Sequence, residues 1–289
     1  MHPKVVKVDV ASLSGLQNMR NTNPTGRGNR QNTSRIRETA IKETALSLGA
    51  QAGLAKRAWA INNELTAQAR YLDTIFDFNA LILEHNVLPP VLLEGRNTLN
   101  IADLQNLRIS NRTYKVYKQA HFVSVAPNWR QYLWMDYKMP EIPVSNLLPK
   151  TAAERDVWRK FVAKGWDKGM EQANNILEDN VARIKEDFAG MVLYRTLLAQ
   201  NMVSAPFVSN TDLGVTGDGS ELHIDDRVLR ITALPALNTD SKSWRAAVTQ
   251  DEKAIDKFNG MEALVKQAKI VVSSQRWQPI ITPINDRKG

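Results

Sequence analysis

The chain has 289 residues, of which 43% are hydrophobic, and its formal net charge is +8. This length allows one large domain or two ordinary ones, each with a substantial core. The absence of cysteine excludes disulfides, thiolate nucleophiles and cysteine-ligated zinc, and no apolar run approaches the roughly 18 residues of a membrane-spanning helix.

The positive charge is concentrated near the N-terminus. Residues 1–60 contain ten Lys or Arg against three Asp or Glu, so the other residues are nearly neutral. Because residues 14–34 are polar and have few apolar anchors, the sequence predicts that residues 1–34 form a flexible basic arm or linker. Such an arm favours tethering to an anionic surface or partner, and a solvated tail is the alternative.

A long helical region is predicted to follow the arm. Ser34 has the side chain of an N-cap, and apolar residues recur at helical spacing over residues 41–76. This pattern predicts one long helix or two consecutive helices that end before Pro89. Gly49 and Gly53 are four residues apart within it and leave room for a closely packed neighbour.

The next stretch has strand character. Residues 88–96 contain a Pro-Pro turn in an apolar context, and residues 107–125 alternate β-branched or aromatic residues with basic ones. The alternation predicts two strands of a hairpin or one long bent strand. Thr151 and Glu154 then have the spacing of a capping box, which begins a second long helix that ends near Pro206.

The C-terminal part repeats the change from strand to helix. Residues 207–231 have the pattern of a hairpin with a glycine turn, and residues 244–268 that of a last helix. The predicted fold class is α+β, with long helices packed on a small mixed or antiparallel sheet and extended N- and C-terminal arms. The predicted organisation is a single domain over residues 35–269, followed by a tail over residues 270–289.

The sequence lacks a pattern that demands catalysis. It contains no His-Glu-x-x-His motif, no nucleophile elbow and no phosphate-binding loop, and the expectation is therefore no enzyme, no metal and no cofactor. Glu178, Asp179, Glu186 and Asp187 are interpreted as the solvated face of a helix. One acidic group is open to two interpretations, calcium ligands or turn and capping carboxylates: Asp212, Asp218, Asp225 and Asp226.

An aromatic cluster is the best candidate for an interface, because Trp, Tyr and Arg anchor protein–protein contacts. Core packing is the alternative for each tryptophan, and Trp158 and Trp166 are assigned to the core. The candidate interface residues are Trp129, Arg130, Tyr132 and Trp134 of the cluster, together with Arg96, Arg112 and Trp277.

Several separate blocks resemble, in the same order, the DotC family of type IVB secretion and related conjugation systems. The resemblance covers about residues 15–265, and the blocks are residues 88–97, 112–115, 127–133, 165–169, 202–206, 213–217 and 226–232.

This resemblance implies an outer-membrane lipoprotein on the periplasmic side, a structural subunit of the secretion core. It implies assembly with DotD-like and DotH-like subunits into a large hetero-oligomeric ring that exports effectors or conjugative cargo, without nucleic-acid binding by this subunit. The family's signal peptide and lipidated cysteine are not found in this sequence, so either the lipid anchor belongs to a precursor, as is expected here, or membrane attachment comes from partners.

Two other function classes remain open on the sequence alone. A nucleic-acid-binding module would use the basic arm and bind DNA with a steep salt dependence. An enzyme or periplasmic solute-binding protein would need a deep pocket with convergent polar groups in the sheet region.

Overall fold

The computed structural model of the protein describes residues 11–21, 35–101, 107–244, 249–268 and 270. These residues form two compact units. Of the described residues, unit 1 contains 11–21, 35–69, 133–181 and 270, and unit 2 contains 70–101, 107–132, 182–244 and 249–268. One helix, α5 (Ala152–Ala199), contributes its first part to unit 1 and the remainder to unit 2.

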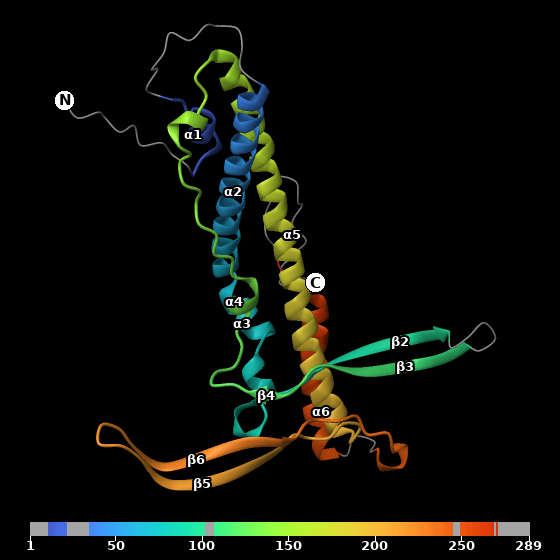
Figure 1. Ribbon diagram of the computed structural model, residues 1–289. Helices are drawn as coiled ribbons and strands as arrows, with labels where there is room; N and C mark the ends of the chain where they lie inside the picture. Colours follow the sequence, from blue (N-terminus) through green and yellow to red (C-terminus); the bar gives the residue numbers. More distant parts are fainter. Residues whose placement is uncertain (1–10, 22–34, 102–106, 245–248, 269, 271–289) are drawn as a thin grey trace, which may run out of the picture. The chain divides into compact units, whose positions relative to one another are not determined.

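Two long helices, α2 (Arg35–Ala67) and the first part of α5, form the frame of unit 1 (Figure 1). Both long helices are therefore confirmed, and the short α3 (Ala69–Ile75) follows α2. The capping box is confirmed as well. The N–H of Glu154 donates to Thr151 Oγ1 at 3.2 Å, and the N–H of Thr151 donates to the Glu154 carboxylate at 3.3 Å.

Four glycines allow the backbones of α2 and α5 to approach closely within unit 1. A Cβ atom on any of them would lie between 2.1 and 2.4 Å from a carbonyl oxygen of the facing helix, closer than a side chain can pack. They are Gly49 and Gly53 in α2, and Gly165 and Gly169 in α5. The close neighbour predicted for Gly49 and Gly53 is confirmed.

Residues 11–21 differ from the flexible arm that the sequence predicts. They contain a short helix, α1 (Leu13–Gln17), and the side chains of Leu16 and Met19 are buried in the core of unit 1. Trp158, a confirmed core residue, donates its indole N–H to the carbonyl oxygen of Leu16 at 2.9 Å, and Trp166 packs against the same core while partly buried. Two apolar anchors thus hold this segment, although the average composition of residues 14–34 is polar. The other residues of the predicted arm lie outside the described residues, as does the tail after residue 270.

Among the described residues, unit 2 combines helices of different lengths with three antiparallel strand pairs. After α3, its elements are η1 (Phe78–Leu81), η2 (Glu84–Asn86), β1 (Val87–Leu88), β2 (Val91–Ile101), β3 (Leu107–Lys118), β4 (His121–Phe122), α4 (Trp129–Leu133), the second part of α5, β5 (Phe207–Gly217), β6 (Leu222–Ala233), η4 (Ser241–Ser243) and α6 (Thr249–Gln267). A further 3₁₀ turn, η3 (Ser145–Leu147), belongs to unit 1.

Strands β2 and β3 form one long hairpin, and strands β5 and β6 form another. The hairpin predicted over residues 207–231 is confirmed, and so is the last helix, as α6. Residues 107–125 form one long strand followed by the short β4, and the partner of β3 is β2. Strand β2 was not predicted, because Pro89 and Pro90 suggested a turn. Both prolines precede the strand, where a missing N–H costs no ladder hydrogen bond.

The α+β fold class is confirmed: long helices accompany small antiparallel sheets, each of two strands in the part of the chain that the structure describes. The single domain over residues 35–269 stays a prediction. No helix within the described ranges combines the length and hydropathy of a membrane span.

Candidate protein interface

Trp129, the centre of the predicted interface cluster, belongs to the core of unit 2. Its side chain has no exposed surface, and its indole N–H donates to Asp73 Oδ1 at 2.6 Å. The guanidinium of Arg130 lies 4.2 Å from the Trp129 ring centre and 3.4 Å from the same Asp73 oxygen. The Trp129 ring therefore helps to position the Arg130 guanidinium at the surface. Because the Trp129 side chain is fully buried, it cannot contact a partner itself.

The other candidate interface residues are divided between the units. Tyr132 is half-buried in unit 2, whereas Trp134 belongs to unit 1 and is 47% exposed. Arg96 and Arg112 lie on the β2–β3 hairpin. Trp277 lies outside the described residues. A role of this set in binding a partner stays a prediction.

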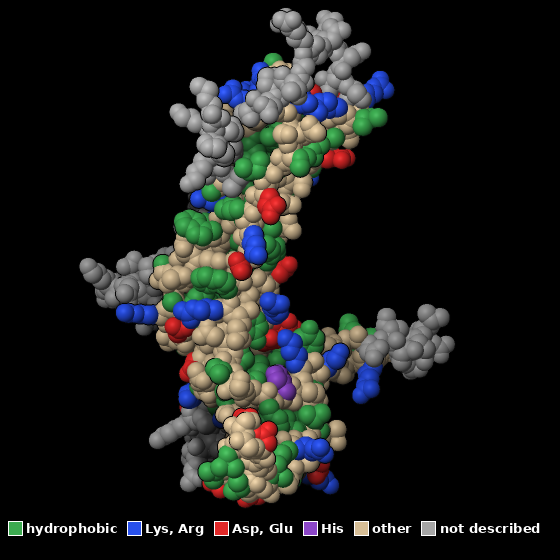
Figure 2. Space-filling model, turned by 60° about the vertical axis from the view of Figure 1, so that its left-hand side comes forward, with side chains coloured by type: hydrophobic (Ala, Val, Ile, Leu, Met, Phe, Trp, Pro, Cys, Tyr) green, Lys and Arg blue, Asp and Glu red, His purple; other side chains and the backbone are tan. Residues whose placement is uncertain are grey.

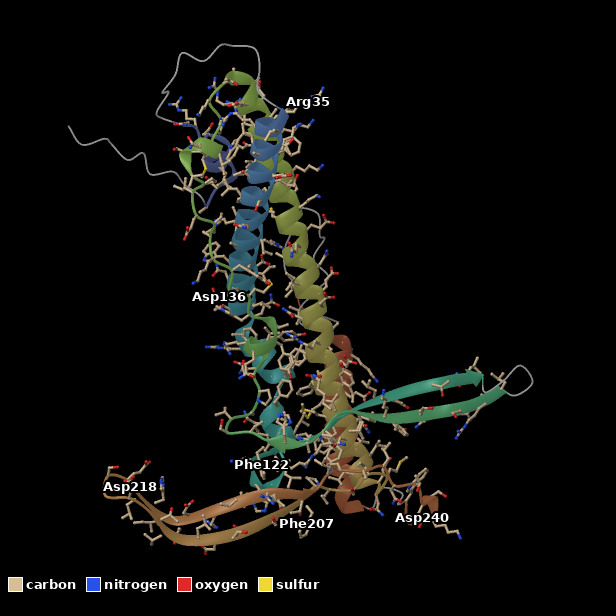
Figure 3. The ribbon with its side chains drawn as sticks, viewed as in Figure 1. Arg35, Phe122, Asp136, Phe207, Asp218 and Asp240 are labelled. Atoms are coloured by element: carbon tan, nitrogen blue, oxygen red, sulfur yellow. The ribbon has the colours of Figure 1, made fainter. Side chains whose placement is uncertain are left out.

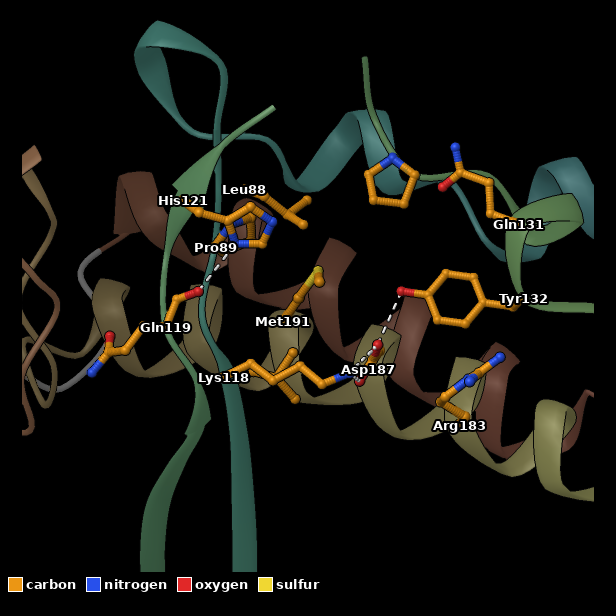
Figure 4. Close-up of a pocket in the computed structure, with 12 residues that line it drawn as sticks. Leu88, Pro89, Lys118, Gln119, His121, Gln131, Tyr132, Arg183, Asp187 and Met191 are labelled. Carbon is orange, nitrogen blue, oxygen red and sulfur yellow. Dashed lines mark hydrogen bonds and ion pairs between the residues drawn. The ribbon is translucent and has the colours of Figure 1, made fainter. Parts of the chain in front are cut away.

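Asp187 of α5 is the centre of a polar network at the base of the β2–β3 hairpin. Its buried carboxylate accepts from Lys118 Nζ at 2.6 and 2.7 Å and from the Tyr132 hydroxyl at 3.0 Å. Figure 4 shows both side chains directed at Asp187. The assignment of Asp187 to the solvated helix face was wrong. Asp187 lies one helical turn before the buried Met191 and therefore on the same face of α5. This spacing was the signal in the sequence that Asp187 is buried.

The network borders a pocket of about 430 Å³ in unit 2 (Figure 4). Burial, the charge of Asp187 and the hydrogen bond to it raise the pKa of Tyr132, so the phenol remains a donor. His121, also in the pocket wall, contacts the carbonyl oxygen of Gln119 at 3.2 Å rather than Asp187. Asp187 thus accepts hydrogen bonds from the Lys118 ammonium and the Tyr132 phenol. These hydrogen bonds connect β3, α4 and α5.

Strand β2 is anchored to the same helix through a close backbone contact. A Cβ atom on Gly190 would lie 2.4 Å from Val91 Cγ1 and 2.7 Å from the Leu92 carbonyl oxygen. Leu92 is buried in an apolar cluster with Tyr194. Gly190 and Asp187 are three residues apart in α5, so one helix face holds both strands of the hairpin at their base.

Beyond this base, the β2–β3 hairpin exposes apolar side chains. Leu99, Leu107 and Ile109 are 65%, 54% and 62% exposed, and Leu99 and Ile109 are direct partners across the strands. In Figure 2, hydrophobic and basic side chains lie together on the surface of this hairpin. Large apolar side chains exposed on a two-stranded sheet are typical of a surface that contacts another protein or a membrane.

The stem of the same hairpin is basic. Arg96 and Arg112 are opposite each other in the ladder, and both are mostly exposed. They share one carboxylate, Glu94, at N–O distances of 3.3 and 3.7 Å. Like charges that face each other across a ladder are unfavourable, and one partly exposed carboxylate compensates only part of this repulsion.

The β5–β6 hairpin is more exposed still. Val215, Leu222 and Ile224 are 65%, 65% and 70% exposed, and Phe207 at its base is also exposed. Figure 3 shows the hairpin extending from Phe207 to the turn at Asp218. An isolated two-stranded sheet is marginally stable in water, which again indicates a missing partner.

Two aspartates of this hairpin, Asp212 and Asp218, have turn roles, in agreement with one of the two interpretations. Asp218 accepts from the hydroxyl and N–H of Ser220 at 2.6 and 2.7 Å, and these hydrogen bonds lower the pKa of Asp218. Asp212 accepts from the Gly214 N–H, and Asp226 from the Thr216 hydroxyl. No group of three or more potential metal ligands occurs among the described residues.

The comparisons with known proteins agree with an assembly role. A search of curated proteins finds no match to the chain. A family model described as type IV secretory system, conjugal DNA-protein transfer (T4SS_TraI) matches residues 35–246, which include both long hairpins and both long helices. With most of its length matched in this way, the chain belongs to this family of type IV secretion and conjugal transfer proteins.

Proposed function

We propose that the chain is a non-enzymatic structural subunit of the outer-membrane core of a DotC-like type IVB secretion system. In this role it scaffolds the export of effector proteins or conjugative cargo. The observation that carries the proposal is the exposure of large apolar side chains along two two-stranded hairpins of a conjugal transfer protein. Subunits that bury such surfaces against neighbours gain stability and fix the geometry of an assembly.

The proposed partners are DotD-like and DotH-like subunits in a hetero-oligomeric ring. The proposed location is the periplasmic face of the outer membrane, reached through a lipid anchor on the precursor. Support comes from the ordered blocks that resemble the DotC family and from the conjugal transfer family match.

A transfer assay with a shortened hairpin tests the scaffold role. In a strain that lacks the gene, conjugal transfer is measured after complementation with the native gene or with a variant in which a short Gly-Ser turn replaces residues 209–231. We expect the variant to accumulate and to retain its helical circular dichroism, because the removed residues are mostly exposed. Transfer and co-purification of the other core subunits from detergent extracts should be lost. Normal transfer with the shortened hairpin would contradict the proposal.

The membrane location has its own test. The full-length precursor is expressed in cells supplied with a traceable palmitate analogue, and the membranes are then fractionated. We expect label on the protein and recovery with the outer membrane. Recovery in the cytosolic fraction without label would refute the outer-membrane location. The scaffold role would then still be tested separately by the transfer assay.

A solute-binding or enzymatic role is the second candidate function, and the pocket beside Asp187 is the observation that favours it. The wall of this pocket has one carboxylate, and Lys118 and Tyr132 already engage it. A ligand would need to break this network to reach the carboxylate. The Asp187 network therefore supports the scaffold role more strongly, because it holds the base of the β2–β3 hairpin.

A further inference from the structure

The two long hairpins of unit 2 match in length and are opposite in charge. Strands β2 and β5 each have 11 residues, and strands β3 and β6 each have 12. Residues 91–118 contain five Lys or Arg and two Asp or Glu, whereas residues 207–233 contain two Arg and five Asp or Glu. The first hairpin therefore has a net charge of +3, and the second has −3.

These charges are available at the surface. Arg96 and Arg112 are 68% and 65% exposed, and Arg108 and Lys115 are exposed as well. On the other hairpin, Glu221 is 73% exposed and Asp225 is exposed. Complementary charges at the surface steer association and suppress contacts between two copies of the same hairpin.

Both hairpins also have unpaired edges. Each described sheet has two strands, so the two hairpins do not pair with each other within the chain. Along each outer edge, N–H and C=O groups are available to another strand. Their matched lengths allow such pairing to continue over most of a strand, and the exposed apolar side chains would be covered at the same time.

We propose that the β2–β3 hairpin of one copy pairs edge to edge with the β5–β6 hairpin of a second copy. The contact joins two different surfaces, so it is heterologous, and a row of copies joined in this way keeps one unused hairpin at each of its two ends. Such a contact generates a closed ring or an open filament rather than a two-fold dimer. The choice of a ring rests on the proposed function, but the contact between copies does not.

Two charge variants of the full-length chain test the contact. The first, R108E/K115E, changes the β2–β3 hairpin from net +3 to −1. The second, E221K/D225N, brings the β5–β6 hairpin from net −3 to zero, and asparagine suits the positive φ of 57° at position 225. All four side chains are exposed, so both variants should keep the native circular dichroism and melting temperature.

Sedimentation velocity of the purified protein over a range of concentrations gives the readout. We expect the native chain to associate, with an affinity that falls as salt concentration rises. Each variant alone should associate about tenfold more weakly or worse. A mixture of the two variants should form a one-to-one dimer that does not grow, because one native hairpin of each kind remains in the mixed pair.

A matched control variant has two basic residues outside the hairpins replaced by glutamate. The variant K164E/K168E reverses two exposed lysines of α5 in unit 1 and should associate like the native chain. A monomeric native chain at every concentration would overturn the inference, as would either hairpin variant that associates as tightly as the native chain. If instead the native chain stays monomeric and binds anionic vesicles or DNA through Arg108 and Lys115, the basic hairpin serves another partner and the inference also falls. The transfer assay proposed above is independent of these outcomes, so the scaffold role stands or falls separately.

Discussion

Lys118 at the end of β3 and Asp187 in α5 are joined by contacts of 2.6 and 2.7 Å from one ammonium to both carboxylate oxygens. The carboxylate is buried, whereas the lysine side chain is 43% exposed. The pair therefore connects an exposed hairpin to a helix that belongs to the core of unit 2. Because Asp187 is buried, its carboxylate depends on hydrogen-bond donors of the protein in place of water.

Removal of Lys118 should destabilise the protein. In Lys118→Met, the Asp187 carboxylate loses both contacts to the ammonium and keeps the hydrogen bond from the Tyr132 hydroxyl, so we expect a loss of about 1–3 kcal/mol in the free energy of unfolding. Urea denaturation measures the change. Lys115→Met, on the same strand but exposed, is the control and should stay within about 0.5 kcal/mol of the native chain. Equal effects of the two substitutions would show that the ion pair contributes nothing.

The glycine contact between α2 and α5 predicts a strong steric effect. In Gly165→Leu, the side chain would start 2.2 Å from the Leu46 carbonyl oxygen, so the two backbones must separate. We expect a loss of at least about 2–3 kcal/mol, measured by thermal or urea unfolding.

The control for this substitution is another helical glycine. Gly260 lies in α6, and apart from its neighbours in that helix, no atom of the described residues lies within 4 Å of the position that a Cβ on it would occupy, so Gly260→Ala should raise stability by about 0.5–1 kcal/mol. A Gly165→Leu protein as stable as the native chain would mean that the helices do not approach closely in solution.

The two tryptophans of the aromatic cluster should respond differently to truncation. Trp129→Ala removes a buried ring and its hydrogen bond to Asp73, with an expected loss of about 3–5 kcal/mol. Trp134→Ala removes a ring that is 47% exposed, and the expected loss is about 1 kcal/mol or less. Melting curves of both variants check this order, and a reversed order would place Trp134 rather than Trp129 in the core.

Much of the fold follows from local sequence patterns. The helical spacing after residue 34, the capping box at Thr151 and the glycine turn between β5 and β6 each specify an element through neighbouring residues. Strand β2 was missed because the two prolines before it carry a stronger local signal than its own mixed composition. Although β2 and β3 are consecutive in sequence, the pairing partner of β3 was missed together with strand β2.

The candidate interface was harder to predict than the fold. Trp and Arg residues were singled out because of their types, but composition does not distinguish Trp129, which is buried, from Trp134, which is exposed. Asp187 was assigned to solvent because charged residues surround it in sequence, whereas its position relative to Met191 places it inside. The opposite charges of the two hairpins are present in the sequence, but only the register of the strands shows which residues to count together.

The start of α5 should confer a specific dependence of stability on pH. Burial would by itself raise the pKa of Glu154, but hydrogen bonds from Arg37 and from the N–H groups of Lys150 and Thr151 lower it overall. The Arg37 Nε to Glu154 Oε1 distance is 2.7 Å, and the Glu154 side chain is only 5% exposed.

Since the folded-state pKa of Glu154 lies below its unfolded value, the stabilisation is fully present above the unfolded pKa of about 4.3. It is lost as the pH falls through the folded-state pKa. Relative to the native chain, Glu154→Gln should lose about 1–2 kcal/mol at neutral pH, because the charge-assisted bonds are replaced by weaker neutral ones. The two proteins should converge in stability as the pH falls through the folded-state pKa of Glu154, as urea denaturation at a series of pH values will show. Glu178→Gln, an exposed position of the same helix, should follow the native curve throughout. A stability difference between Glu154→Gln and the native chain that persists unchanged in acid would mean that packing, and not the carboxylate charge, stabilises this helix start.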